Sequence, residues 1–493
     1  MSNSSSKDII KPGLPRGLRD LNNLELKLLK NIISKISKVY ESYGFEELST
    51  PAFEFSDALG KFLPDQDRPN AGVFSFQDDD EKWLSLRYDL TAPLARYVGE
   101  NYDKITKPYK RFQVGSVWRN EKPGPGRFRE FLQLDADIVG SDNYLADSEL
   151  IMLACDCMRT LGLDKNNYSI RVSNRKLLDS ILELIANNEQ IDDARRLIIL
   201  RAIDKLDRVG VSGVERLLSN GRKDESGDFT KGAELSKASI SKILDFLSID
   251  NEDRKKFISQ AGSIVNKTVA GQEALKELSE IDLLLAKLDY KEEVLFDSSI
   301  VRGLEYYTGT IFEANLQFDS SNDNKFPVIG SIGGGGRYDR LISRFRKDQI
   351  GATGFSIGVS RLATILQMAE FQLGEPSNGP VLILKMDTEF DYSYYQIAKE
   401  LRDEGILAEV YVGSSGMKAQ MKYADKKNSP IVIIEGTDER EKGIVTIKNL
   451  IKGKEISTSI DSRESWIKNS DIQFEVDRDK LVSKISKLLN SSN

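Results

Sequence analysis

Residues 118–131 read Trp118-Arg119-Asn120-Glu121-Lys122-Pro123-Gly124-Pro125-Gly126-Arg127-Phe128-Arg129-Glu130-Phe131, and this stretch decides the fold. Strand-like runs flank it between Trp83 and about Gly140, and its Pro/Gly tip predicts a turn. We therefore expect an antiparallel β-hairpin. Side chains two residues apart in a strand share a face, so Arg119 and Glu121 on one arm and Arg127 and Arg129 on the other can face one pocket.

Positive charge is concentrated at this hairpin. From Lys104 to Arg129 there are eight Lys or Arg residues and one acid, although the whole chain has a net charge of −7. Guanidinium groups bind phosphate oxygens through two hydrogen bonds, and a carboxylate can accept from an adenine amino group. The pattern favours triphosphate binding, and a solvated basic face is the alternative.

The composition excludes several kinds of chemistry. The chain has 493 residues and no histidine, which rules out Ser/His/Asp and Cys/His catalysis and histidine-ligated zinc. Its two cysteines, Cys155 and Cys157, lie too close in sequence for an ordinary disulfide and lack the spacing of zinc ligands. We therefore expect both to serve as small apolar residues of a helix, in a protein of a reducing compartment. No stretch approaches the ~20 apolar residues that span a membrane, so we expect a cytoplasmic protein without a membrane partner.

The pattern changes several times along the chain. Apolar spacing predicts a helix over 24–43, ended by Gly44 and followed by a short strand that Pro51 closes. Residues 175–288 have helical spacing, whereas strand patterns return over 294–358 and lead into a helix to about residue 372. After a Gly/Pro/Ser linker at 374–379, strands alternate with helices, and a terminal helix is expected over 481–489.

These patterns predict an α/β (α+β) protein in four parts. They are a split domain over 1–174 and 292–374, a helical insertion over 175–291, an α/β domain over 379–462 and a helical tail over 463–493.

Two further motifs lie in the second half of the split domain. The run Gly333–Gly336 lacks the Gly-Lys-Ser/Thr of a P-loop, so we expect it to allow close approach of a neighbouring strand or a small ligand. The segment 302–309 places one arginine, one carboxylate and two tyrosines within eight residues. The tyrosines either bind a ligand or fill a core.

Together these motifs resemble the histidyl-tRNA synthetase family, whose members are class II aminoacyl-tRNA synthetases, and the resemblance is strongest to alphaproteobacterial members. The matching stretches, in order, are Leu86–Ala92, Trp118–Glu121, Gly126–Phe131, Arg302–Tyr307, Gly334–Asp339 and Gly354–Leu362. The resemblance implies a class II antiparallel-sheet catalytic domain with a helical insertion and a C-terminal anticodon-binding domain. It also implies a homodimer built by the helix-to-Pro51 segment.

The resemblance implies a histidine–tRNA ligase. Histidine and ATP form histidyl-adenylate and pyrophosphate, and the histidyl group then passes to the 3′ end of tRNA(His). Because two anions must meet in the first step, catalysis is expected to be mainly positioning and charge neutralisation. By resemblance, Arg119 and Arg302 are the catalytic residues at the α-phosphate, and no residue is assigned as a metal ligand.

The other ATP contacts implied by the resemblance are Arg127 and Arg361 at the β- and γ-phosphates with Mg²⁺, Glu121 at the adenine amino group and Phe131 on the adenine ring. The implied histidine-binding residues are Asp89, Thr91 and Gln133 at the α-amino group, Asp137 and Tyr307 at the imidazole, and Arg302 and Tyr306 beside them. Two positions depart from the family pattern: Ser360 stands where many class II enzymes have Glu, and Asp89 where other bacterial branches have Glu.

In the C-terminal part, Lys418, Lys422 and Lys426 fall on one predicted helix face. They form either a solvated face or a stripe that follows a tRNA backbone. The region from residue 378 onward is not basic overall, with eighteen positive and nineteen negative residues.

Two other functions compete with the ligase. One is the histidine-binding paralogue that regulates ATP phosphoribosyltransferase, which generally lacks an anticodon-binding domain. The other is a class II synthetase for threonine, proline or glycine, which lacks the 302–309 signature.

Overall fold

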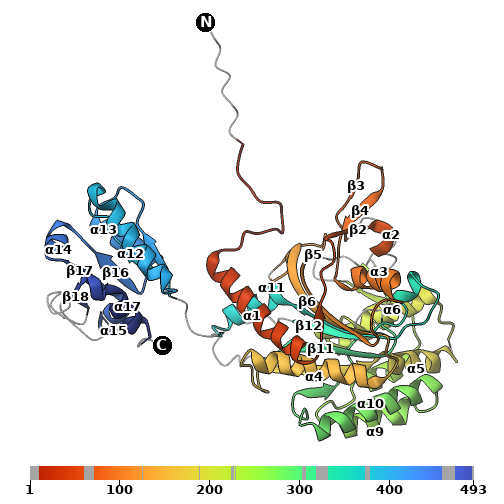
Figure 1. The fold of residues 1–493 in the computed structure, drawn as a ribbon. Helices are drawn as coiled ribbons and strands as arrows, with labels where there is room; N and C mark the ends of the chain where they lie inside the picture. Colours follow the sequence, from red (N-terminus) through yellow and green to blue (C-terminus); the bar gives the residue numbers. More distant parts are fainter. Residues whose placement is uncertain are drawn as a thin grey trace. The chain divides into compact units, whose positions relative to one another are not determined.

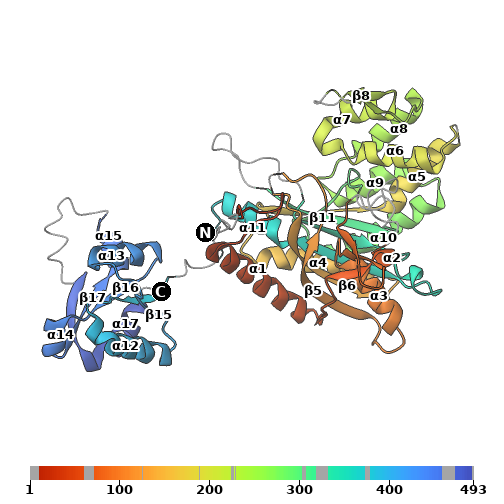
Figure 2. The same cartoon turned by 90° about the horizontal axis from the view of Figure 1, so that it is seen from above.

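The computed structural model describes residues 10–59, 72–124, 126–187, 189–223, 227, 229–301, 307–317, 331–371, 373, 378–457 and 472–490. The chain divides into two compact units, Met1–Leu373 and Gly374–Asn493, which are drawn in Figures 1 and 2. The predicted linker begins at this boundary, although residues 374–377 lie outside the described ones.

The first unit is built on an eight-stranded sheet in the order β1-β5-β6-β13-β12-β11-β7-β10. The two outer pairs, β1 with β5 and β10 with β7, are parallel, and the other neighbours are antiparallel. The strands are β1 (Glu46–Glu47), β5 (Tyr109–Trp118), β6 (Glu130–Val139), β7 (Tyr168–Asn174), β10 (Val294–Phe296), β11 (Thr310–Leu316), β12 (Gly333–Arg337) and β13 (Ala352–Gly358). This sheet confirms the predicted core built on an antiparallel sheet.

Helices α1 (Asn23–Ser42), α4 (Tyr144–Thr160) and α11 (Val359–Met368) contribute to the core beside this sheet (Figure 1). The predicted helix over 24–43 is present as α1, and the Asn22 side chain caps its start by accepting hydrogen bonds from Leu24 N–H and Glu25 N–H. Apolar residues at helical spacing then bury one face of α1, and both cysteines are buried in α4. Helix α11 ends at Met368, before the expected residue 372.

Within the described residues, the segment predicted as a helical insertion contains six helices and one small hairpin. They are α5 (Arg175–Ala186), α6 (Asp193–Ile203), α7 (Leu206–Leu218), β8 (Gly221–Lys223), β9 (Phe229–Lys231), α8 (Lys237–Leu247), α9 (Arg254–Val265) and α10 (Val269–Lys287). Figure 2 shows α6, α7, α8 and β8 grouped together. Their buried residues are continuous with the core of the sheet.

A second, three-stranded sheet follows α1, in the order β2-β4-β3. Its elements are β2 (Phe53–Phe55), α2 (Ser56–Leu59), β3 (Ser75–Gln77) and β4 (Trp83–Leu86), and α3 (Thr91–Asn101) comes next. The short 3-10 turn η2 (Ile342–Arg344) packs near α3.

The C-terminal unit has a five-stranded sheet in the order β15-β14-β16-β17-β18. Its elements are β14 (Val381–Ile383), η3 (Thr388–Phe390), α12 (Asp391–Asp403), β15 (Ala408–Val410), α13 (Met417–Lys426), β16 (Ile431–Ile434), α14 (Thr437–Glu441), β17 (Ile444–Asn449), α15 (Leu450–Ser457), β18 (Gln473–Asp477), η4 (Arg478–Lys480) and α17 (Leu481–Asn490). The predicted α/β alternation is therefore present. Within the segment expected to be a helical tail, β18 pairs with β17, and α17 packs its apolar face into the core of this unit.

Candidate active site

The hairpin of β5 and β6 forms as predicted. Its register runs from Tyr109 opposite Val139 to Trp118 opposite Glu130. Beyond the strands, Arg119 N–H donates to the Arg129 carbonyl at 2.9 Å. At the tip, Gly124 and Arg127 exchange backbone hydrogen bonds of 3.2 and 2.9 Å.

The two faces of β6 have opposite chemistry. Leu134, Ala136 and Ile138 belong to the apolar core. Gln133, Asp135 and Asp137 alternate with them along the strand and share the other face, and all three are buried, with exposed fractions of 7, 2 and 2%. Three polar groups buried in one row indicate a prepared binding surface rather than a packing face.

Neighbouring strands complete this polar face. Arg111 and Gln113 on β5 lie opposite Asp137 and Asp135, while Ser356 on β13 lies opposite Asp135. Gly354 lies opposite Asp137, and a Cβ atom there would be 2.0 Å from Asp137 Oδ1. A glycine at this position is therefore required for the Asp137 carboxylate to hold its place.

Asp137 is held by two partners from distant parts of the chain. Arg111, fully buried, forms an ion pair with it at 2.9 Å, Nη2 to Oδ2. The Tyr338 hydroxyl donates to Asp137 Oδ1. Burial raises the pKa of Asp137, and Arg111 and the Tyr338 hydrogen bond oppose that rise.

Asp135 lies between Gln133 and Asp137 on this face, and its pKa is also raised. Burial raises its pKa to about 8, and the neighbouring charge of Asp137 adds to this rise. Arg111 and a hydrogen bond from Ser356 oppose it. Ser356 also accepts a hydrogen bond from Gln133 Nε2 at 2.9 Å.

Several buried atoms of this face make no hydrogen bond within the described part of the chain. They are Gln133 Oε1, Asp135 Oδ1, Asp137 Oδ2, Arg111 Nε and Arg111 Nη1. Asp137 Oδ2 is nevertheless paired with Arg111 Nη2 in the ion pair described above. An unsatisfied buried donor or acceptor costs about 1–3 kcal/mol, so the other four atoms on one face indicate that a polar ligand binds there.

At the hairpin end of the site, charged and aromatic side chains lie together. The Arg119 guanidinium lies 4.3 Å from the centroid of the Tyr88 ring and 5.1 Å from that of Phe131. The Tyr88 hydroxyl donates to Glu121 Oε1 at 2.9 Å. Burial raises the pKa of Tyr88 to about 12, with Arg119 opposing the rise and Glu121 adding to it. The structure thus brings three predicted ATP residues, Arg119, Glu121 and Phe131, to one place.

Asp89 connects this end of the site to α3. Its Oδ1 accepts from Thr91 N–H at 3.2 Å and from Ala92 N–H at 2.9 Å, which caps the start of the helix. The intervening Leu90 carbonyl accepts from Arg111 Nη2 at 2.9 Å. Asp89 and Thr91 are thereby tied to the same face as Asp137.

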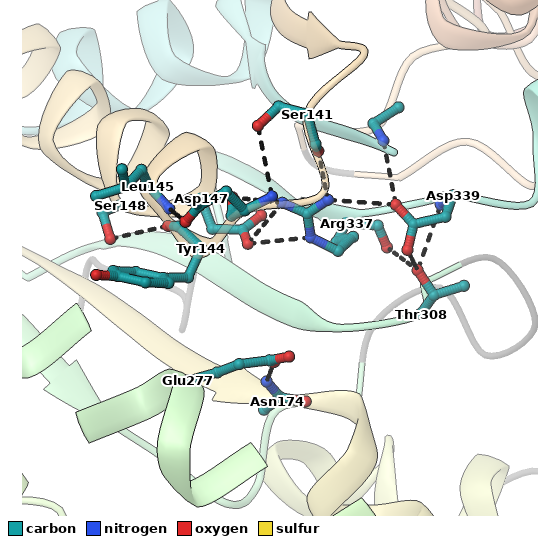
Figure 3. A network of polar contacts seen from close by, with 12 residues as sticks. Ser141, Tyr144, Leu145, Asp147, Ser148, Asn174, Glu277, Thr308, Arg337 and Asp339 are labelled. Atoms are coloured by element: carbon teal, nitrogen blue, oxygen red, sulfur yellow. Dashed lines mark hydrogen bonds and ion pairs between the residues drawn. The ribbon is translucent and has the colours of Figure 1, made fainter. Parts of the chain in front are cut away.

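Arg337, a buried arginine at the end of β12, holds together a second network of polar contacts (Figure 3). Arg337 Nη2 contacts Asp147 Oδ2 at 2.9 Å, and Arg337 Nη1 contacts Asp339 Oδ1 at 3.3 Å. Asp339 Oδ2 accepts from the Thr308 hydroxyl at 2.6 Å. Arg337 thus connects the end of β12, just before Tyr338, to the segment that begins just after Tyr307. Both tyrosines pack in the same small apolar core.

The remaining predicted residues have varied positions. Arg302 and Tyr306 lie outside the described residues. Arg127 is exposed at the hairpin tip, and Arg361 is half-buried in the first turn of α11. Beside Arg361, Ser360 Oγ accepts from Leu132 N–H at 3.0 Å. In the C-terminal unit, Lys418, Lys422 and Lys426 are all exposed on α13.

Asp135, Arg111 and Tyr338 were not predicted as site residues from the sequence. A signal existed for Asp135, because it shares the two-residue period of Gln133 and Asp137. For Arg111 the signal was only its place in the basic hairpin. Tyr338 lies in a quoted motif, but nothing local indicated its contact with Asp137.

The comparisons with known proteins cover both units. A model of the family "Histidyl-tRNA synthetase" matches residues 17–362, and a model of the "Anticodon binding domain" matches residues 380–488. Similar curated proteins named "Histidine--tRNA ligase" include one from Bartonella bacilliformis, 49% identical over 99% of each chain. Another, from Brucella abortus, is 50% identical over 98% of this chain and 97% of the relative.

Solved structures share this fold. A histidyl-tRNA synthetase from Nostoc sp. PCC 7120 matches with a TM-score of 0.73 and 25% identity, covering 97% of this chain and 100% of that one. A Bacillus halodurans protein described as an ATP phosphoribosyltransferase regulatory subunit/histidyl-tRNA synthetase matches with a TM-score of 0.65 and 24% identity, over 84% of this chain and 97% of that one.

Proposed function

This chain belongs to the histidyl-tRNA synthetase family, and from that premise we propose how its residues divide the work of the reaction. The protein activates L-histidine with ATP and transfers the histidyl group to the 3′ end of tRNA(His). The observation that supports the division of roles best is the polar face of β5, β6 and β13, with its unpaired buried atoms.

Histidine binds on that face. Gln133 Oε1, Asp89 and Thr91 accept from or orient the α-amino group, and Asp137 and Tyr307 bind the imidazole ring. Tyr306, which lies outside the described residues, is assigned to histidine binding by the family resemblance alone. Arg111 and Tyr338 hold the Asp137 carboxylate in place for the ring. A site whose buried groups must be paired rejects amino acids that lack the ring nitrogens by ~10⁴–10⁵.

ATP binds at the hairpin end. Glu121 accepts from the adenine amino group, and the adenine stacks on Phe131. The Arg119 guanidinium lies 5.1 Å from the centroid of Phe131 in the structure, which places its charge beside the proposed adenine site, and Arg119 contacts the α-phosphate. Arg302 approaches the same phosphate, and the two charges stabilise the pentacoordinate transition state without a catalytic base.

Arg127 and Arg361 bind the β- and γ-phosphates with Mg²⁺. The described residues include no group of three or more Asp, Glu or Cys side chains that would form a metal cage. This fits an ion that enters with ATP and is held mainly by phosphate oxygens. When bound, the ion neutralises phosphate charge. The arginines themselves bind the phosphates and stabilise the transition state.

The C-terminal unit binds the tRNA anticodon arm. The anticodon-binding family match supports a tRNA partner. We assign backbone contacts to the exposed lysine stripe of α13, made of Lys418, Lys422 and Lys426.

The protein works as a homodimer in the cytoplasm. One face of the three-stranded sheet carries Phe53, Phe55 and Phe76, which are 49, 54 and 44% exposed. This apolar face comes after α1 and Pro51 in the chain. A second copy of the protein covers it, because the family resemblance implies a dimer built by the helix-to-Pro51 segment. No described helix is long and apolar enough to cross a membrane.

Histidine-dependent ATP–pyrophosphate exchange tests the activity. We expect exchange with histidine and none with threonine, proline or glycine. Histidine binding without exchange would instead favour the regulatory paralogue, which the full-length ligase relatives and the anticodon-binding match do not favour.

A further inference from the structure

The tip of the β5–β6 hairpin carries two of the proposed ATP residues, Glu121 and Arg127. The ladder of the hairpin ends with Trp118 opposite Glu130, so both residues lie beyond its regular hydrogen bonds. A tip that is ordered only when ATP arrives would weaken binding by the cost of that ordering. Contacts that fix the tip beforehand therefore contribute to ATP binding.

A tight turn over residues 15–19, just before α1, lies against this tip. Leu18 N–H donates to the Pro15 carbonyl at 3.1 Å, and Gly17, the third residue of the turn, has a φ of +84°. A positive φ at the third residue is characteristic of a type II turn, and glycine adopts it without strain. Gly17 thus determines the shape of the 15–19 turn.

Gly17 also makes the first contact with the hairpin. Its carbonyl accepts from Arg129 N–H at 2.9 Å, and Arg129 Nε donates to the Glu121 carbonyl on the other arm at 3.1 Å. A Cβ atom on Gly17 would lie 2.8 Å from Arg129 Cγ and 3.3 Å from Pro123 Cβ. The absence of a side chain is what allows the turn and the hairpin to approach this closely.

Arg19 makes the second contact. Its guanidinium carbon lies 4.2 Å from the centroid of the Phe128 ring, which is a cation–π geometry. On the other side, Arg19 Nη1 donates to Glu25 Oε1 at 2.7 Å, and Glu25 Oε2 accepts from Asn22 N–H at 3.0 Å in the capping box of α1. Arg19 therefore connects the first turn of α1 to the hairpin tip.

We propose that Gly17 and Arg19 are positioning residues for ATP binding: they hold the hairpin tip against the start of α1, so that Glu121 and Arg127 are presented to the nucleotide. Phe128 follows Arg127 directly in the chain, so a fixed Phe128 ring restricts where Arg127 can lie. The inference rests on the proposed role of the hairpin in ATP binding.

The test is pyrophosphate exchange by the full-length protein, with the KM for ATP and the KM for histidine measured separately. We expect Arg19→Gln to raise the KM for ATP about two- to fivefold, the size of a partly exposed cation–π contact. Gly17→Ala should raise it at least as much, because the turn must move away from Arg129. The KM for histidine should be unchanged in both variants, since Gln133 and Asp137 lie within the ladder.

Two matched controls separate this role from charge and from substitution itself. Arg16→Gln removes the same charge from an exposed side chain of the same turn. Gly13→Ala adds a Cβ atom that would have no heavy atom of the described residues within 4 Å. Both should leave the two KM values unchanged. In addition, Arg19→Gln combined with Phe128→Leu should raise the KM for ATP no more than the stronger single variant, because both break one contact.

Equal rises in the KM for ATP and for histidine would overturn the inference, because they would mean that the 15–19 turn only supports the fold. An unchanged KM for ATP would overturn it as well, and so would additive effects of Arg19→Gln and Phe128→Leu or an equal effect of Arg16→Gln. Failure of the proposed function is separate, since it appears as absent histidine-dependent exchange in the unsubstituted protein.

Discussion

Arg111 and Asp137 form an ion pair of 2.9 Å in which the arginine side chain has no exposed surface and the aspartate 3%. Neutralising one member of such a pair leaves the other charge buried, which typically costs about 3–5 kcal/mol. Because Asp137 is also the proposed imidazole ligand, this pair connects stability to substrate recognition.

We therefore expect Arg111→Met to lower stability by about 3–5 kcal/mol and to weaken histidine binding. Arg111→Lys keeps the charge and should lose less. Thermal unfolding and histidine binding measured on both variants check this. If Arg111→Met were as stable as the unsubstituted protein, Asp137 would not depend on Arg111.

Arg302→Ala should reduce the rate of adenylate formation by about a hundredfold or more, because a charge that stabilises the transition state is removed. Single-turnover formation of histidyl-adenylate measures it, with circular dichroism to show that the variant folds. Arg346→Ala, at an arginine that pairs with Asp103 near the surface, is the control. A normal activation rate in Arg302→Ala would refute the assigned role.

Replacing Lys418, Lys422 and Lys426 together by Gln should leave histidine activation unchanged and raise the KM for tRNA. Each lost phosphate contact reduces the slope of log affinity against log salt by about 0.7–0.9, so the slope of the triple variant should drop by about 2.1–2.7. Gln at Lys399, Lys442 and Lys487, three exposed lysines elsewhere in this unit, provides a control of equal charge. Equal effects of the two triple variants would mean that only net charge matters.

Gly354→Ala should weaken histidine binding more than ATP binding, because the new Cβ would lie 2.0 Å from Asp137 Oδ1 and must displace it. The KM for each substrate in pyrophosphate exchange measures the difference. Gly262→Ala in α9 is the control, since its Cβ would lie 3.7 Å from the Leu275 side chain, an ordinary contact. Unchanged KM for histidine in Gly354→Ala would show that Asp137 can move without cost.

The sequence predicted what local patterns determine. The hairpin, α1 and the α/β alternation of the C-terminal unit follow from turn residues, caps and periodicity. The partners of Asp137 do not, because Tyr338 is 201 residues away, and only the folded sheet brings them together. Likewise, β18 lies in the segment that was predicted to be a helical tail. Its residues Phe474 and Val476 alternate with exposed residues, but an alternation over five residues is too short to predict a strand when its neighbouring strand is not known.

The absence of histidine from the chain removes the usual titrating side chain near neutral pH, and Asp135 takes that place. Burial raises its pKa to about 8 in the folded protein, whereas an unfolded Asp titrates near ~3.9. Between these values the folded state holds a proton that the unfolded chain releases. Stability should therefore fall as the pH rises from about 4 to about 8, by at most about 1.4 kcal/mol per pH unit for this one group.

Asp135→Asn removes the titrating group, so its melting temperature should fall less between pH 5 and pH 8 than that of the unsubstituted protein. Asp147, whose pKa burial raises to about 6 with Arg337 opposing, contributes with the same sign at the lower end and remains in both proteins. Asp80→Asn, at an exposed residue, should leave the pH dependence unchanged. If Asp135→Asn and the unsubstituted protein lost stability in parallel across this range, Asp135 would be ionised throughout, and Arg111 would have to neutralise both carboxylates of the site.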